Sequence, residues 1–156
     1  MSTRITAEPK ECEECGAALA PSEACEQSFH KLLAFEFENR SAFAEHHLTV
    51  ACYCLQHPKG FSSEAVGAWW EVVRSSVEHG TPPATIRREM SARLEGGTKL
   101  RREGWNVAVW WPRIWPVTVR DVVQPEDMTA SPVTHVELVR KWAQSVLHTL
   151  DRSRST

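Results

Sequence analysis

The chain has 156 residues, 18 basic and 20 acidic side chains, and a formal net charge of −2. That length is typical of one domain, and the balanced charge gives no general electrostatic reason to bind nucleic acid. No apolar run approaches the roughly 18 residues of a membrane span, and residues 1–10 lack the apolar core of a secretory signal. We therefore expect a soluble cytoplasmic protein with no membrane or nucleic-acid partner.

The chain reads as one structural unit with short polar ends. Residues 1–11 carry no apolar period, so we expect a flexible N-terminus there. Residues 12–150 are predicted to form a single helical domain, and residues 151–156 a flexible C-terminus. The segment 12–20 is compact and turn-like, with Gly16 directly after the second cysteine.

The first three helices are predicted from apolar periodicity and capping residues. A helical pattern begins at residue 21, with Ser22 as its N-cap, and a second helix runs from the cap Ser41 to about His57. A third spans residues 62–79, with Gly80 in the C-terminal capping position.

The second half is less regular until its last helix. Residues 85–94 indicate a fourth helix, and apolar residues alternate at positions 107–111 as in a short strand. Thr118 and Asp121 resemble a helix-start box. Ser131 is then the predicted cap of a last, strongly amphipathic helix that has proline at its first position. The fold class predicted is mainly α: a compact single-domain helical bundle with an N-terminal cysteine-rich loop.

Tryptophan is unusually frequent, and four of the seven lie in the Trp-rich segment 105–115: Trp105, Trp110, Trp111 and Trp115. These rings either cap a small core or form an aromatic wall around a ligand, and the first interpretation is the commoner one. The stretch before this segment, residues 87–102, is rich in basic residues: Arg87, Arg88, Arg93, Lys99, Arg101 and Arg102. A solvated helix face explains this stretch better than a phosphate-binding surface does.

The five cysteines are odd in number, and no export signal precedes them, which argues against a disulfide scaffold. Cys12 and Cys15 are separated by two residues and followed by Gly16, so both thiolates can turn toward one ion. Cys25 supplies a third thiolate. The sequence therefore favours bound Zn²⁺, with reduced free thiols and a redox pair as the alternatives.

A zinc ion would need a fourth ligand, for which His57 is preferred and His46 or His30 are alternates. His46 and His57 are eleven residues apart, or about 16 Å along a helix, so both cannot bind one ion. His57 lies at the helix end, where the chain can turn toward the cysteines. His46 should instead face Glu36 or Tyr53, in a cavity covered by the Trp-rich segment.

Two functions are compatible with these residues. In the first, Cys12, Cys15, Cys25 and His57 hold structural zinc, and a polar pocket of Glu36, His46 and Tyr53 binds a small ligand or a partner. In the second, the protein is a metal-dependent hydrolase or a related small-molecule enzyme of a biosynthetic pathway. An open metal position would then activate water, with Glu36 as base and Tyr53 stabilising an oxyanion.

Residues 46–50 (HHLTV) and 53–58 (YCLQHP) resemble a bacterial family catalogued as domain of unknown function 5946. The resemblance extends over about residues 12–147. It also includes the motif CEECG at residue 12, TVRDV at residue 118, and His135. The resemblance implies that this chain shares seven positions with the family: Cys12, Cys15, Cys25, His46, Tyr53, Gln56 and His57. His30, His47, Cys52 and Cys54 depart from the pattern, and the family supplies no activity.

His135 falls in the first turn of the last predicted helix. A cation is disfavoured at that end of a helix. We therefore expect His135 to have a specific partner.

Overall fold

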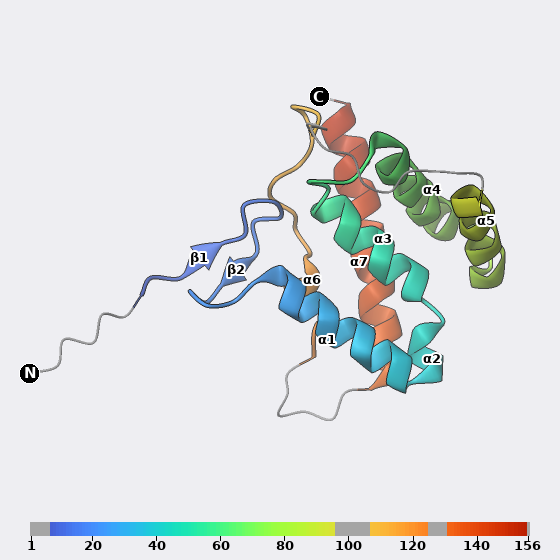
Figure 1. Ribbon diagram of the computed structural model, residues 1–156, viewed down its shortest axis with the longest axis horizontal. Helices are drawn as coiled ribbons and strands as arrows, with labels where there is room; N and C mark the ends of the chain where they lie inside the picture. Colours follow the sequence, from blue (N-terminus) through green and yellow to red (C-terminus); the bar gives the residue numbers. More distant parts are fainter. Residues whose placement is uncertain (1–6, 96–106, 125–130, 156) are drawn as a thin grey trace, which may run out of the picture.

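The computed structural model describes residues 7–95, 107–124 and 131–155. The elements in this part of the chain are β1 (Lys10–Glu11), β2 (Ala18–Leu19), α1 (Cys25–Glu38), α2 (Arg40–Phe43), α3 (His46–Gln56), α4 (Ser63–His79), α5 (Pro83–Glu95), α6 (Val119–Val122) and α7 (Pro132–Arg154). Helices dominate, and the cysteine-rich loop lies near the N-terminus (Figure 1). The predicted fold class is therefore confirmed.

Helix α3 lies at the centre of the bundle, packed against both α4 and α7, which also contact each other, and α1 runs along its side (Figure 1). Leu48, Ala51 and Leu55 of α3 are at most 1% exposed, as are Trp142 and Val146 of α7. A helix that is buried on most sides needs apolar residues around its axis. The polar residues of α3 are consequently concentrated toward its two ends, where the neighbouring segments differ.

Local capping chemistry sets the bounds of the long helices as predicted. The Ser62 hydroxyl accepts the Ala65 backbone N–H at 3.1 Å, and α4 ends at Gly80, whose φ of 58° suits glycine. Ser131 caps α7 in the same way, with proline in its first turn. The Thr118–Asp121 box opens α6, because the Asp121 carboxylate accepts the Thr118 backbone N–H at 2.8 Å.

Three expectations for local structure are wrong. Helix α1 begins at Cys25 rather than near Ser22, and Gln27 Oε1 accepts the Ala24 backbone N–H at its start. The helix expected over residues 41–57 is two helices, α2 and α3, separated at Glu45 (φ −103°, ψ 16°). The strand expected at 107–111 is a turn, closed by the Trp111 N–H on the Ala108 carbonyl oxygen at 2.9 Å.

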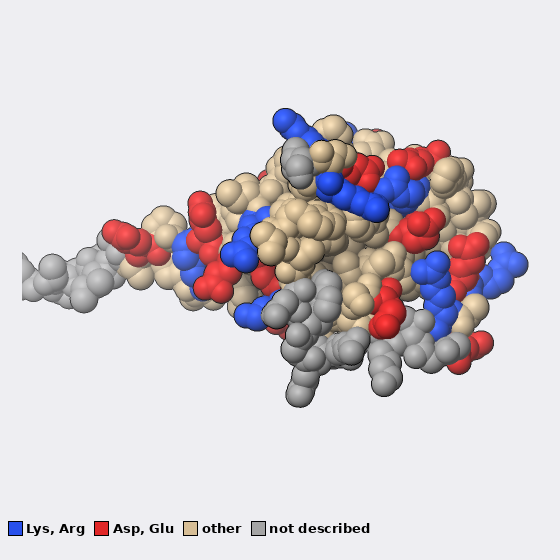
Figure 2. All heavy atoms as spheres, turned by 90° about the horizontal axis from the view of Figure 1, so that it is seen from above, with Lys and Arg blue, Asp and Glu red and all other residues tan. Residues whose placement is uncertain are grey.

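Acidic and basic side chains are interspersed on the face that Figure 2 shows, and neither sign forms a separate patch there. On α5 the exposed residues Arg87, Arg88 and Arg93 alternate with Glu89 and Glu95, the pattern of a solvated helix face. The remaining basic residues of that stretch, Lys99, Arg101 and Arg102, lie outside the described residues. None of the described helices combines the length and the apolar character needed to cross a membrane.

The chain is ordered beyond the expected domain limits at both ends. Lys10–Glu11 pairs antiparallel with Ala18–Leu19, so strand β1 begins before Cys12. Helix α7 continues past residue 150 to Arg154.

Candidate metal centre

The hairpin formed by β1 and β2 presents the first two cysteines in a tight turn. The Cys12 backbone N–H donates to the Ala17 carbonyl at 2.9 Å, and the Gly16 N–H donates to the Cys12 carbonyl at 2.8 Å. These bonds fold the five residues from Cys12 to Gly16 back on themselves. The thiols of Cys12 and Cys15 therefore reach the same small volume.

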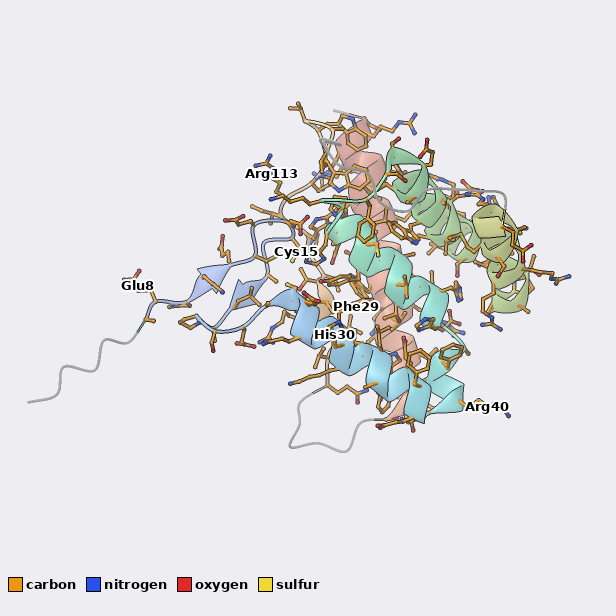
Figure 3. All side chains as sticks on the ribbon, in the orientation of Figure 1. Glu8, Cys15, Phe29, His30, Arg40 and Arg113 are labelled. Carbon is orange, nitrogen blue, oxygen red and sulfur yellow. The ribbon has the colours of Figure 1, made fainter. Side chains whose placement is uncertain are left out.

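Gly16 is required in this turn for two reasons. Its φ is +77°, in the left-handed region that costs other residues about 1–2 kcal/mol. A Cβ there would also lie 3.2 Å from the Arg113 carbonyl oxygen and 3.3 Å from Ile114 Cα. The segment 107–117 thus lies directly on the turn, and Figure 3 shows Arg113 beside the loop that carries Cys15. The backbone N–H of Trp115 donates a hydrogen bond to the backbone carbonyl of Cys15 at 3.2 Å.

Cys12, Cys15, Cys25 and His57, hereafter the cysteine cluster, converge on one point. Their ligand atoms all lie within 4.8 Å of one another. Cys15 Sγ and Cys25 Sγ are 3.6 Å apart, as are Cys12 Sγ and His57 Nε2. Donors on a tetrahedral zinc ion are separated by about 3.8 Å for two sulfurs and about 3.6 Å for sulfur and nitrogen. The described cysteines are free thiols, and this cluster could hold a metal ion.

The hydrogen bond of His57 leaves its outer nitrogen ready to bind a metal. His57 is the C-cap of α3, and its Nδ1 lies 2.9 Å from the Tyr53 carbonyl oxygen. Because a carbonyl only accepts, Nδ1 must carry the proton. In the neutral ring the lone pair is then on Nε2, which faces Cys12. Backbone carbonyls commonly orient metal-binding histidines in this way.

Aromatic packing holds the His57 ring in place. The Tyr53 ring stacks on His57 at 4.3 Å between centroids and on Phe29 of α1 at 3.9 Å. Burial raises the pKa of the Tyr53 phenol, so this group stays protonated at neutral pH. Tyr53 therefore belongs to the wall of the cysteine cluster.

The protonation of these groups depends on whether a cation is near. The hydrogen bond with Cys25, together with burial, raises the pKa of the Cys15 thiol to about 12. Burial alone would lower the pKa of His57, but its contacts with Cys15, the Tyr53 carbonyl and Glu14 together outweigh this and raise it. A divalent cation reverses the balance, since a coordinated thiol is deprotonated outright. Three sulfurs and one imidazole are a donor set that suits zinc.

The two alternate ligands lie elsewhere. The His30 side chain is 65% exposed and pairs with Glu26 of its own helix at 3.7 Å. His46 lies at the opposite end of α3 from His57, where its Nδ1 is 3.3 Å from Glu36 Oε1. Of the three candidate histidines, the structure brings only His57 to the cysteines.

Glu36, His46 and His135, hereafter the Glu36 cluster, meet at that opposite end. Glu36 is fully buried, and His135 Nε2 lies 3.4 Å from its Oε2. Burial alone would raise the pKa of Glu36, but the contacts with His135 and His46 outweigh it and hold the pKa below its usual range. Glu36 is thus the specific partner expected for His135.

The comparison with protein families covers almost the whole chain. The profile of the family of unknown function DUF5946 matches residues 10–151. The chain belongs to this family. No curated protein and no solved structure matches it. The resemblance seen in the sequence is therefore confirmed, and membership of DUF5946 assigns no activity to either cluster.

The predicted pocket of Glu36, His46 and Tyr53 is not assembled in this DUF5946 member. Glu36 and His46 are in contact, but Tyr53 stacks at the cysteine end of α3. The Trp-rich segment also covers that end, because the Trp111 indole N–H donates to the Leu55 carbonyl at 3.0 Å. Trp105 lies outside the described residues.

A hollow of about 430 Å³ lies beside the cysteine turn. Its lining comes from that turn, from the residues just after α3 and from the segment 107–113, and includes Glu14, Lys59, Trp111 and Arg113. Neither Glu36 nor His46 lines it.

Sequence reasoning missed the ionic surroundings of the Glu36 cluster. Glu45 is buried at the break between α2 and α3, and its Oε1 accepts a hydrogen bond from Arg140 at 3.0 Å. His47 packs beside it, and burial lowers the pKa of His47. These contacts join residues far apart in the chain. The one local signal in the sequence was that His135 falls in the first turn of a helix, which indicated that it needs a specific partner.

Proposed function

We propose that this DUF5946 protein is a zinc protein whose cysteine cluster binds one Zn²⁺ ion in a structural role. The observation that carries the proposal is the convergence of four donor atoms within 4.8 Å, with two pairs, Cys15–Cys25 and Cys12–His57, each 3.6 Å apart as on a tetrahedral ion. The hydrogen bond that leaves Nε2 of His57 free for a metal supports the same assignment.

A structural role is favoured over hydrolysis because four protein ligands fill a tetrahedral site. No coordination position then remains for a reactive water. Glu36 is also badly placed to act as base at this ion. It is eleven residues from Cys25 along α1, or about 16 Å of helix.

The bound ion would join three segments that are separate in the sequence. It would link the β1–β2 hairpin, the first residue of α1 and the C-terminal end of α3. The zinc-fixed turn forms one wall of the 430 Å³ hollow. We infer that this hollow binds a small ligand or a partner segment, since Lys59 and Arg113 offer charge beside the Trp111 ring.

The cytoplasm is the compartment we propose. All described cysteines are free, and a thiolate zinc site needs thiols that stay reduced.

Elemental analysis of protein purified without chelator tests the proposal. We expect at least one zinc per chain in the wild type, and we expect His57→Ala to lose that equivalent because Nε2 supplies the fourth ligand. The control is His30→Ala, which removes an exposed imidazole that could have served as the ligand. Less than about a tenth of an equivalent in the wild type, or equal loss in both variants, would refute the site.

A further inference from the structure

Three elements far apart in the sequence bring the Glu36 cluster together. Glu36 comes from the last turns of α1, His46 begins α3, and His135 lies in the first turn of α7. The Glu36 and His135 side chains are at most 1% exposed, whereas 23% of the His46 side chain is exposed. The cluster is thus buried but can be reached from the side of His46.

Two buried atoms of this cluster face each other without a hydrogen bond. Glu36 Oε2 and His135 Nε2 are 3.4 Å apart, and neither has a hydrogen-bond partner. An imidazolium and a carboxylate in a well-made hydrogen bond are about 2.7–2.9 Å apart. The contact between His46 Nδ1 and Glu36 Oε1 is also long, at 3.3 Å.

These separations match those between neighbouring ligands on one metal ion. With bonds of about 2.1 Å and angles between octahedral and tetrahedral values, adjacent donor atoms lie about 3.0–3.4 Å apart. Buried polar atoms without a partner lower the stability of the folded protein. A metal ion bound between Glu36 and His135 would give both atoms a partner and remove this cost.

We propose that Glu36, His46 and His135 form a second metal site, which binds a divalent first-row transition metal. Two imidazoles and one carboxylate are nitrogen and oxygen donors that suit Fe²⁺, Mn²⁺, Co²⁺ or Zn²⁺. Three protein ligands leave coordination positions open to water or substrate. The site is therefore of a different kind from the cysteine cluster, and it does not depend on zinc binding there.

The Glu36 cluster must tighten to hold an ion. Among the described residues, the cysteine cluster is the one group of three or more such donors that all lie within 4.8 Å of one another. The two histidines contact different oxygens of Glu36, so an ion would take both oxygens and draw the rings together. His46 is the member that solvent can reach, since 23% of its side chain is exposed, and its ring stacks on Phe43 at 4.7 Å. We expect weaker binding than at the cysteine cluster.

Equilibrium dialysis of the zinc-loaded full chain against Co²⁺ tests this site. The chain is loaded with one equivalent of zinc, which the tighter cysteine cluster takes, and excess zinc is removed, so cobalt counted by elemental analysis reports on other sites. The wild type should bind about one cobalt per chain, with the weak visible absorption of nitrogen and oxygen ligands. Glu36→Gln and His46→Ala should each lower this below about a tenth of an equivalent, and His30→Asn should leave it unchanged.

Each outcome decides the proposal. Cobalt binding that is absent from the wild type, or equal in the wild type and both variants, overturns it. His46→Ala removes the one partly exposed side chain of the cluster and carries the test if Glu36→Gln fails to fold. Cys12→Ser separates the two sites. If the cysteine cluster binds zinc, this variant should lose it, and in either case it should keep the cobalt that Glu36→Gln abolishes.

Discussion

The two ends of α3 carry polar clusters of opposite character. At the C-terminal end, three thiols and an imidazole converge on one point, and the segment 107–117 packs over them. At the N-terminal end, one buried carboxylate lies between two imidazoles that contact different oxygens. The first group is neutral when its thiols are protonated, whereas the second contains an ionised Glu36.

The difference shows how each end is stabilised. Neutral thiols can pack closely without electrostatic cost. They add little to the stability of the fold until they are deprotonated and bound by a metal cation. An ionised buried carboxylate must always be paired with a positive charge, either a protonated histidine or a metal cation. We therefore expect the stability of the cysteine end to depend on metal, and that of the Glu36 end to depend on pH.

The largest expected effect is the loss of a cysteine ligand. Cys15→Ser should abolish tight metal binding and lower the free energy of unfolding by about 4 kcal/mol or more, since metal binding there is coupled to folding. Urea unfolding with zinc and with chelator measures this. The wild type should lose most of the same stability in chelator, and the variant should be insensitive to it.

A matched control is Cys52→Ala, which removes a fully buried thiol outside the cluster. It should cost only the packing of one sulfur and keep the response to chelator. If Cys52→Ala lost that response too, the metal dependence would not come from the cysteine cluster.

The second largest effect is expected at Glu36, near the N-terminal end of α3. Glu36→Ala should destabilise the protein by about 2–4 kcal/mol, because His135 would remain buried without its partner. Glu36→Gln should cost less, since it keeps the shape and one oxygen. Thermal or urea unfolding in the presence of chelator measures both without interference from metal.

The pH dependence follows from the lowered pKa of Glu36. The folded state holds this proton less tightly than the unfolded state does, so the contribution is complete above the unperturbed value of 4.5. It is lost as the pH falls below that value through the folded pKa. The wild type should therefore lose more stability than Glu36→Gln between about pH 5 and pH 3, and parallel curves would contradict this assignment.

The smallest effect separates the cysteine turn from an ordinary helix. Gly16→Ala should destabilise by about 1–2 kcal/mol and weaken metal binding, because its φ is +77° and the Arg113 carbonyl is close. Gly67→Ala, in the open middle of α4, should stabilise by about 0.5–1 kcal/mol. Denaturation midpoints of the two variants should move in opposite directions, and a shared sign would contradict the strain assigned to the turn.

Prediction from the sequence succeeded where short-range chemistry decides the structure. Ser62 and Ser131 cap their helices through residues three positions away, so a local pattern was sufficient. It failed at the break between α2 and α3. There the buried Glu45 pairs with Arg140 of α7, a contact that no local pattern contains.

The same distinction applies to the candidate sites. The spacing of Cys12 and Cys15 is a local signal, and the helix end at His57 pointed to the imidazole that the structure brings to them. The pairing of Glu36 with His135 joins α1 to α7, so the sequence could indicate only that His135 needed a partner. Tyr53 was misplaced because it lies seven residues after His46 on α3, so its ring packs at the cysteine end of the helix and not beside Glu36.

The position of the segment 107–117 over the cysteine turn has a consequence during synthesis. All four donors of the cysteine cluster have left the ribosome once residue 57 emerges, but Trp115, whose N–H binds Cys15, follows much later. At about 5–20 residues per second, several seconds separate these events. The nascent chain thus holds a complete but uncovered set of thiols, which a metal ion or an oxidant can reach before the last third of the protein covers it.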